Sequence, residues 1–116
     1  MANEDQRCSF GCPVEAALEI LGGKWKGLIL YHLRDEHRRF NELKRLIPGI
    51  TQRMLTKQLR ELEADKIVHR EIFREIPPKV EYSLTNFGLT LTPILDALQK
   101  WGIEYIAEIT KIRNEA

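Results

Sequence analysis

The sequence lacks the features that mark several large classes of protein. No apolar run reaches the ~18 residues that a transmembrane helix requires, so no membrane contact is expected. A glycine-rich phosphate loop, a cluster of metal ligands and a plausible pair of nucleophile and base are all missing, which argues against an enzyme. The two cysteines, Cys8 and Cys12, are too few for a structural zinc site, and the three histidines are scattered. We therefore expect neither a metal nor another cofactor.

The first residues, MANEDQRCSFGC, are polar and include acids, so they do not resemble a secretory signal peptide. A cytoplasmic location is the expectation, and a structural disulfide is disfavoured in that compartment. Internal repeats, low-complexity tracts and long linkers are also missing. The 116 residues suit a single domain with one modest core.

Charge is plentiful but unevenly distributed along the chain. The formal net charge is only +1. Residues 38–60 nevertheless hold seven Lys or Arg residues and a single Glu, whereas the segments on either side are net acidic. A clustered basic segment favours an anionic partner in a way that the average charge does not.

Four segments in the first part of the chain have a helical pattern of apolar residues. Pro13 suits the first turn of a helix, and we expect Gly22 and Gly23 to end that helix in the left-handed conformation. The second helix is apolar nearly all round, which predicts that it is buried. The segments are 13–21, 24–35, 38–47 and 51–65. The inward residues of the third are predicted to be Phe40, Leu43, Leu46 and Ile47.

A short break separates the third and fourth helices. Pro48 ends the third helix, Gly49 permits a tight turn, and the Thr51 hydroxyl is a good N-cap for the fourth. A helix, a short glycine-containing turn and a second helix form the helix-turn-helix arrangement. The pattern alone is not decisive, because many helical hairpins have no role with DNA.

The sequence pattern changes after the fourth helix. Residues 67–76 and 80–84 are rich in β-branched and aromatic side chains, which predicts two strands. Pro77 and Pro78 cannot donate to a strand ladder and predict the turn between them. Such a hairpin after a helix-turn-helix is a wing. From Thr85 to about residue 112 the pattern is again helical, and Pro93 should kink or restart this helix.

The fourth helix has two contrasting faces. Leu55, Leu59 and Leu62 fall in a narrow sector that would anchor the helix to the core. The opposite sector is polar and cationic, and arginine and glutamine can each bond a base edge through two hydrogen bonds, whereas lysine suits a phosphate. The free N–H groups at the helix N-terminus also favour a phosphate. The residues of this sector are Gln52, Arg53, Thr56, Lys57 and Arg60.

An ordinary solvated amphipathic helix would explain a single polar face. Other cations converge on the same region, however, and a cation on the wing could enter the minor groove beside the major-groove helix. These are Arg38, Arg39, Lys44, Arg74 and Lys79. Together they favour an α+β, mainly helical winged helix-turn-helix that binds double-stranded DNA. A winged helix used purely for protein contact is the competing interpretation.

Three long motifs carry a family resemblance. CPVEAALEILGGKWKGLILYHL, RFNELKRLIPGITQRMLTKQLRELEADKIVHR and PPKVEYSLTNFG resemble the HxlR-type winged helix-turn-helix transcriptional regulators, which are related to the MarR group. The resemblance covers about residues 12–106. It implies a homodimeric transcription factor of bacteria or archaea, more often a repressor than an activator, which binds a pseudo-palindromic operator. It also implies that TQRMLTKQLREL is the recognition helix and PPK the wing tip.

The last helical segment carries more apolar side chains than one small core needs. They could cap the core of a monomer, but exposed aromatic and isoleucine side chains tend to mark interfaces. The resemblance also implies dimerisation through the terminal helices, here residues 13–21 and 85–112. The residues expected at the interface are Leu98, Trp101, Tyr105, Ile106 and Ile109.

Cys12 stands at the expected N-cap of the first helix. The positive end of the helix dipole favours a thiolate there, which would raise its reactivity. The resemblance implies that an equivalent cysteine in several relatives senses oxidants, quinones or aldehydes. Cys12 could instead be a small apolar cap residue. Cys8 departs from the common pattern and could act as the resolving partner in a disulfide.

Overall fold

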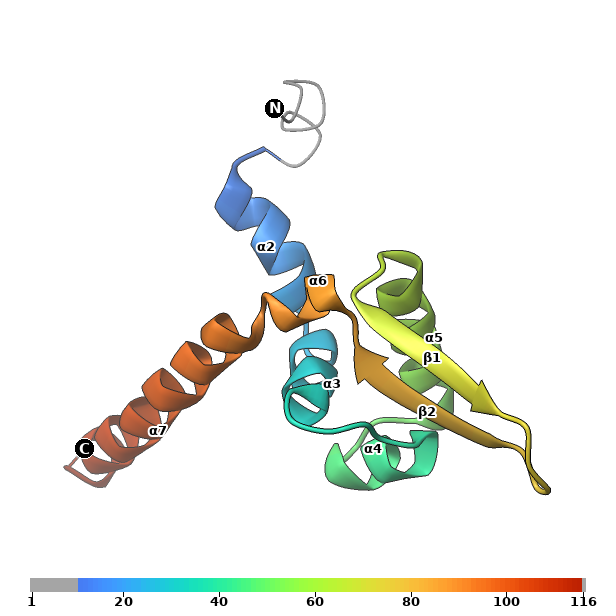
Figure 1. Cartoon of the computed structure of the whole chain (residues 1–116). Coiled ribbons are helices and arrows are strands. Elements are labelled where there is room, and N and C mark those ends of the chain that lie inside the picture. Colours follow the sequence, from blue (N-terminus) through green and yellow to red (C-terminus); the bar gives the residue numbers. More distant parts are fainter. Residues whose placement is uncertain (1–10, 116) are drawn as a thin grey trace.

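The structure, a computed structural model, describes residues 11–115. Its principal dimensions are 57 × 41 × 24 Å, and Figure 1 shows why it is extended: a hairpin and a long helix leave the central helices in different directions. The elements in chain order are α2 (Pro13–Leu21), α3 (Lys26–Leu33), α4 (Phe40–Leu46), α5 (Gln52–Ala64), β1 (Val68–Phe73), β2 (Lys79–Leu84), α6 (Asn86–Leu89) and α7 (Thr92–Glu115).

The first helix, α2, has the predicted bounds, but the reason for its glycine ending is different from the one expected. Gly22 has φ −82°, and neither Gly22 nor Gly23 is left-handed, so that part of the prediction is wrong. The Gly22 N–H donates to the Leu18 carbonyl oxygen at 2.7 Å, and a Cβ at Gly22 would lie only 2.6 Å from this oxygen. Close approach of the backbone, rather than an unusual φ, therefore favours glycine here.

The core lies where α3, α4 and α5 meet. α3 contributes Ile29, Leu30 and Leu33, while its Leu28 is exposed, so this helix is buried on one side and not all round. In α4 only the edge that carries Leu43 and Ile47 reaches the core. Leu46 is 38% exposed, and its predicted inward position is therefore wrong.

The turn before α5 has the predicted form. Gly49 has φ +86°, a conformation that L residues rarely adopt, and Ile50 beside it is buried. The Thr51 hydroxyl oxygen accepts a hydrogen bond from the Met54 N–H at 3.0 Å and so caps α5. Leu55, Leu59 and Leu62 are buried, as the sequence predicted.

The chain reverses after α5 through a left-handed residue, Lys66, with φ +62°. The Ile67 N–H donates to the Leu62 carbonyl oxygen and the Lys66 N–H to that of Glu63, each at 3.0 Å. This pair of bonds is the Schellman ending of a helix, and it satisfies carbonyl groups that the helix leaves free. This ending turns the chain toward β1, and the two residues that follow the turn, Ile67 and Val68, are both buried.

The wing is an antiparallel hairpin of β1 and β2, in which Val68 pairs with Leu84 and Phe73 with Lys79. Arg38 adds a short third partner, because its backbone exchanges two hydrogen bonds with Tyr82, at 2.7 and 3.0 Å. The segment that leads into α4 is thereby fixed to the wing. The fold is the predicted α+β, mainly helical winged helix-turn-helix.

The last helical segment is divided, with α6 and α7 separated at Thr90 and Leu91. Pro93 is the second residue of α7, where its missing N–H costs nothing, so the predicted restart is confirmed. Gly88 packs directly against the chain that follows α5, since a Cβ there would lie 2.2 Å from the Ile67 carbonyl oxygen. No helix among residues 11–115 is long and apolar enough to cross a membrane.

Candidate nucleic-acid interface

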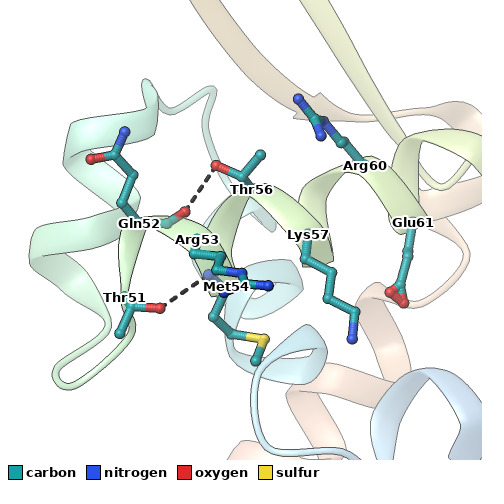
Figure 2. A pocket seen from close by; sticks show the side chains of 8 residues that line it. All are labelled: Thr51, Gln52, Arg53, Met54, Thr56, Lys57, Arg60 and Glu61. Carbon is teal, nitrogen blue, oxygen red and sulfur yellow. Dashed lines mark hydrogen bonds between the residues drawn. The ribbon is translucent and has the colours of Figure 1, made fainter.

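The polar face of α5 is free to meet a partner. Within residues 11–115, the side chains of Arg53, Lys57 and Arg60 are exposed and form no ion pair or hydrogen bond. Figure 2 shows Gln52 and Arg60 on one flank of the helix and Lys57 on the other. The face therefore offers three uncompensated charges and one amide.

Thr56 is the least available member of this polar face. Its hydroxyl donates to the Gln52 carbonyl oxygen at 2.8 Å, a bond drawn in Figure 2. The hydroxyl oxygen can still accept a hydrogen bond, for example from a cytosine or adenine amino group. The Gln52 side chain is exposed and keeps its full capacity to donate and accept.

An internal ion pair keeps the first acid of α5 from cancelling this charge. Glu61 follows Arg60 directly, and its Oε1 lies 3.3 Å from the Lys26 Nζ on α3. Its carboxylate is thus matched by a cation outside the helix. Arg53, Lys57 and Arg60 remain uncompensated, which is the condition for attracting phosphates.

The predicted cations outside α5 differ in how free they are. Arg39 lines a hollow that α4 shares with the start of β2, formed also by Arg45, Pro78 and Lys79. Arg74 on the hairpin loop and Lys44 in the last turn of α4 are exposed, and neither has a side-chain partner within residues 11–115.

Lys79 and Arg38 are already engaged within the protein. The Lys79 Nζ lies 2.9 Å from the Glu81 Oε1 and 4.9 Å from the centre of the Phe73 ring. The hydrogen bond from Lys79 lowers the pKa of Glu81, with a smaller contribution from His37. The Arg38 Nε donates to the His32 carbonyl oxygen at 3.0 Å and its Nη2 pairs with Glu36 at 2.8 Å. The structure therefore gives both side chains an internal role alongside the predicted one.

Sequence reasoning missed the residues that connect α5 to the wing. Arg70 and Tyr82, opposite each other on the two strands, line a hollow together with Thr56 and Arg60. The Arg70 Nε donates to the Glu63 Oε2 at 3.2 Å, and burial raises the pKa of the Tyr82 hydroxyl. Only the pairing register of the strands, which single-sequence patterns do not give, could have identified them.

The long helix α7 presents an apolar stripe to solvent. Leu98, Trp101, Tyr105 and Ile106 are exposed, with Trp101 at 63% and Ile106 at 64%, whereas Ile109 is half-buried. The Trp101 and Tyr105 rings are stacked, with centroids 5.2 Å apart and planes 12° apart. Of the predicted set, four side chains are thus fully available for contact.

A polar joint attaches the first turns of α7 to α3. The Arg34 Nη1 bonds the Asp96 Oδ1 and also donates to the Gln99 Oε1 at 3.2 Å. The Gln99 Nε2 donates to the Tyr31 hydroxyl oxygen at 2.8 Å. No local pattern predicts this joint, because its partners are more than sixty residues apart.

Cys12 occupies the predicted N-cap position of α2. It has an extended backbone, with φ −98° and ψ 161°, and its side chain makes no capping hydrogen bond. The thiol is exposed and not in a disulfide. Cys8 lies outside the described residues.

Known proteins identify the arrangement. The model of the HxlR-like helix-turn-helix family matches residues 20–110. The chain belongs to the HxlR-like helix-turn-helix family. YdeP of Bacillus subtilis (strain 168), an uncharacterized HTH-type transcriptional regulator, is 59% identical over 102 residues, which are 88% of this chain and 80% of YdeP.

Solved structures of other regulators resemble this one over most of the chain. The redox regulator HypR in its reduced form is 56% identical with a TM-score of 0.80, covering 85% of this chain and 98% of HypR. Its oxidized form is 61% identical with a TM-score of 0.77, covering 80% and 96%. Reduced YodB from B. subtilis is 43% identical with a TM-score of 0.69, covering 78% and 89%. The predicted family is confirmed, and the chain is a helix-turn-helix transcriptional regulator.

Proposed function

We propose that this regulator is a homodimer that binds a pseudo-palindromic operator in the cytoplasm and represses transcription. The observation that carries the proposal is the uncompensated polar face of α5, where Arg53, Lys57 and Arg60 have no partner within residues 11–115. Arg53 and Gln52, nearest the N-terminus of the helix, read base edges. Lys57 and Arg60 hold phosphates.

The gel-shift experiment uses the duplex upstream of the protein's own gene at two or more salt concentrations. Binding should weaken steeply with salt, because each phosphate contact releases counterions. Arg53→Ala should relax sequence preference, with a loss of about 1–3 kcal/mol on the preferred site. Lys57→Ala should weaken binding to all sequences evenly. Arg113→Ala, which removes a cation at the far end of α7, is the matched control.

No binding to any duplex, or equal behaviour of Arg53→Ala and Arg113→Ala, would remove the DNA-reading function. In that case a winged helix that contacts another protein becomes the better interpretation.

Pairing of two copies is the second part of the proposal. One winged helix covers a short half-site, and two recognition helices must reach major grooves about 34–36 Å apart. The stripe on α7 is the candidate contact, together with Val14 and Leu18, which α2 leaves exposed. Burial of this apolar surface is the driving force.

We further propose that oxidants or electrophiles, such as quinones and aldehydes, act at Cys12. Its exposed thiol supports this, as do the relatives HypR, a redox regulator solved in reduced and oxidized forms, and YodB, solved reduced and after diamide treatment. In the oxidant reaction, the thiols of Cys12 and of Cys8 or a second Cys12 lose two hydrogens to diamide and form one disulfide. Such a bond would change the spacing of the two recognition helices.

The test compares operator binding of the wild type with that of Cys12→Ser, before and after diamide. The wild type should change its affinity and Cys12→Ser should not. Cys8→Ser, measured in parallel, separates a disulfide to Cys8 from one between two Cys12 residues. An equal response in the wild type and Cys12→Ser would exclude Cys12 as the sensor.

A further inference from the structure

The wing exposes aliphatic side chains that no other part of the described chain covers. Ile76, in the loop between β1 and β2, is 102% exposed, and Ile72 near the end of β1 is 55% exposed. Phe73 beside them is different, because its ring lies 4.9 Å from the Lys79 Nζ. Within residues 11–115 the two isoleucines are therefore aliphatic side chains without a partner, toward the end of an element that projects from the body (Figure 1).

The strand register shows which way Ile72 faces. Ile72 pairs with Val80 and Arg70 with Tyr82, and side chains alternate between faces along a strand, so these four share one face. Arg70 bonds Glu63 of α5, and Tyr82 shares a hollow with Thr56 and Arg60. Ile72 therefore lies on the side of the wing that is turned toward the recognition helix.

The charged residues around the apolar tip are predominantly basic. Arg74 and Glu75 precede Ile76 in the same loop, and the hollow beside Pro78 is lined by Arg39, Glu42 and Arg45 of the α4 side. The three arginines exceed the two acids, and an aliphatic side chain with an excess of cations beside it suits a duplex groove, where phosphates flank apolar sugar edges.

Proline makes the loop suited to burial. Pro77 and Pro78 carry no backbone N–H, so covering this part of the loop leaves fewer donors without a hydrogen bond. Isoleucine and proline are also among the side chains that wedge against base steps in the minor groove.

We propose that Ile76, supported by Ile72, is an apolar contact of the wing with the minor groove of the operator, beside the major groove that α5 occupies. Arg74 holds the adjacent phosphate. The proposal rests on the DNA-binding function proposed above. The contact of Ile76 would contribute to the binding free energy by an amount that does not depend on salt, because burying an aliphatic side chain releases no counterions.

The experiment measures fluorescence anisotropy of the labelled promoter duplex with the full-length protein at several KCl concentrations. Ile76→Ala should raise Kd roughly tenfold by the same factor at every salt concentration, which leaves the salt slope unchanged. Arg74→Ala should raise Kd and reduce the slope by about two per dimer, one phosphate for each wing. Ile76→Leu, which keeps the aliphatic volume, should bind like the wild type. Because Ile76 is fully exposed, its replacement leaves the folded structure unchanged.

Different outcomes of this experiment test the apolar contact and the DNA-binding function separately. If the wild type binds no duplex, the DNA-binding function itself fails. If the wild type binds and Ile76→Ala binds equally well, or if Ile76→Ala flattens the salt slope, the apolar contact alone is overturned. Unchanged DNA binding together with lost regulation in a transcription assay also overturns it, because the tip then meets a protein.

Discussion

Thr51 is the N-cap of α5, and its hydroxyl oxygen accepts a hydrogen bond from the Met54 N–H at 3.0 Å. Thr51→Ala should lower the free energy of unfolding by about 1 kcal/mol, since it leaves this donor without a protein partner. Urea denaturation measures the difference, and Thr51→Ser, which keeps the hydroxyl, is the control. If alanine and serine gave the same midpoint, the cap would not contribute to stability.

His32 links stability to pH. Burial lowers its pKa below the ordinary value of 6.5, and the charge of Arg38 lowers it further. The unfolded chain therefore binds a proton at a higher pH than the folded one. Stability should be complete above about pH 6.5 and should decrease as the pH falls below it. His32→Gln should give a flatter profile of unfolding midpoint against pH, whereas an identical slope would assign the dependence to other groups.

Among the elements, those set by local patterns could be predicted and those set by distant neighbours could not. The leucines of α5 repeat with the helical period, and Thr51 and Gly49 act within a few residues, so the sequence was sufficient for both. Leu46 faces solvent because α4 packs against α3 and β2 with another side. Lys79 contacts the ring of Phe73 because the two residues are partners across the hairpin. Neither the exposure of Leu46 nor this contact of Lys79 follows from the spacing of apolar residues along the sequence.

The attachment of α7 to α3 gives a prediction for a pair of elements. Arg34 bonds Asp96 and Gln99 on α7 but also Asp35 next to it, at 3.3 Å. A double-mutant cycle of Arg34→Ala and Asp96→Ala should give a small favourable coupling energy, as expected for a pair near the surface. The cycle with Asp35→Ala is the control for the joint, because Asp35 does not reach α7. Operator affinity should fall with Asp96→Ala more than with Asp35→Ala.

At the scale of the whole molecule, the apolar stripe of α7 predicts an assembly of two chains. Light scattering should give about twice 13.6 kDa. Ile106→Asp, which places a charge within the stripe, should give a monomer and lower operator affinity. Ala107→Asp adds the same charge to another side of the same helix and should remain dimeric. A monomeric wild type at micromolar concentration would contradict the paired model.

The close packing at Gly88 bears on how the long helix α7 could be exchanged between related regulators. Its backbone packs against Ile67, whose N–H completes the Schellman ending of α5. The Thr85 hydroxyl donates to the carbonyl oxygens of Lys66 and Ile67, at 2.6 and 3.1 Å. The path of residues 85–91, which lead into α7, is therefore fixed by contacts with the end of α5, before the Arg34 joint holds the long helix itself. Replacing the chain after Leu91 with the corresponding long helix of a relative should change which chain the protein pairs with. The DNA preference of this protein should stay the same, because α5 is unchanged.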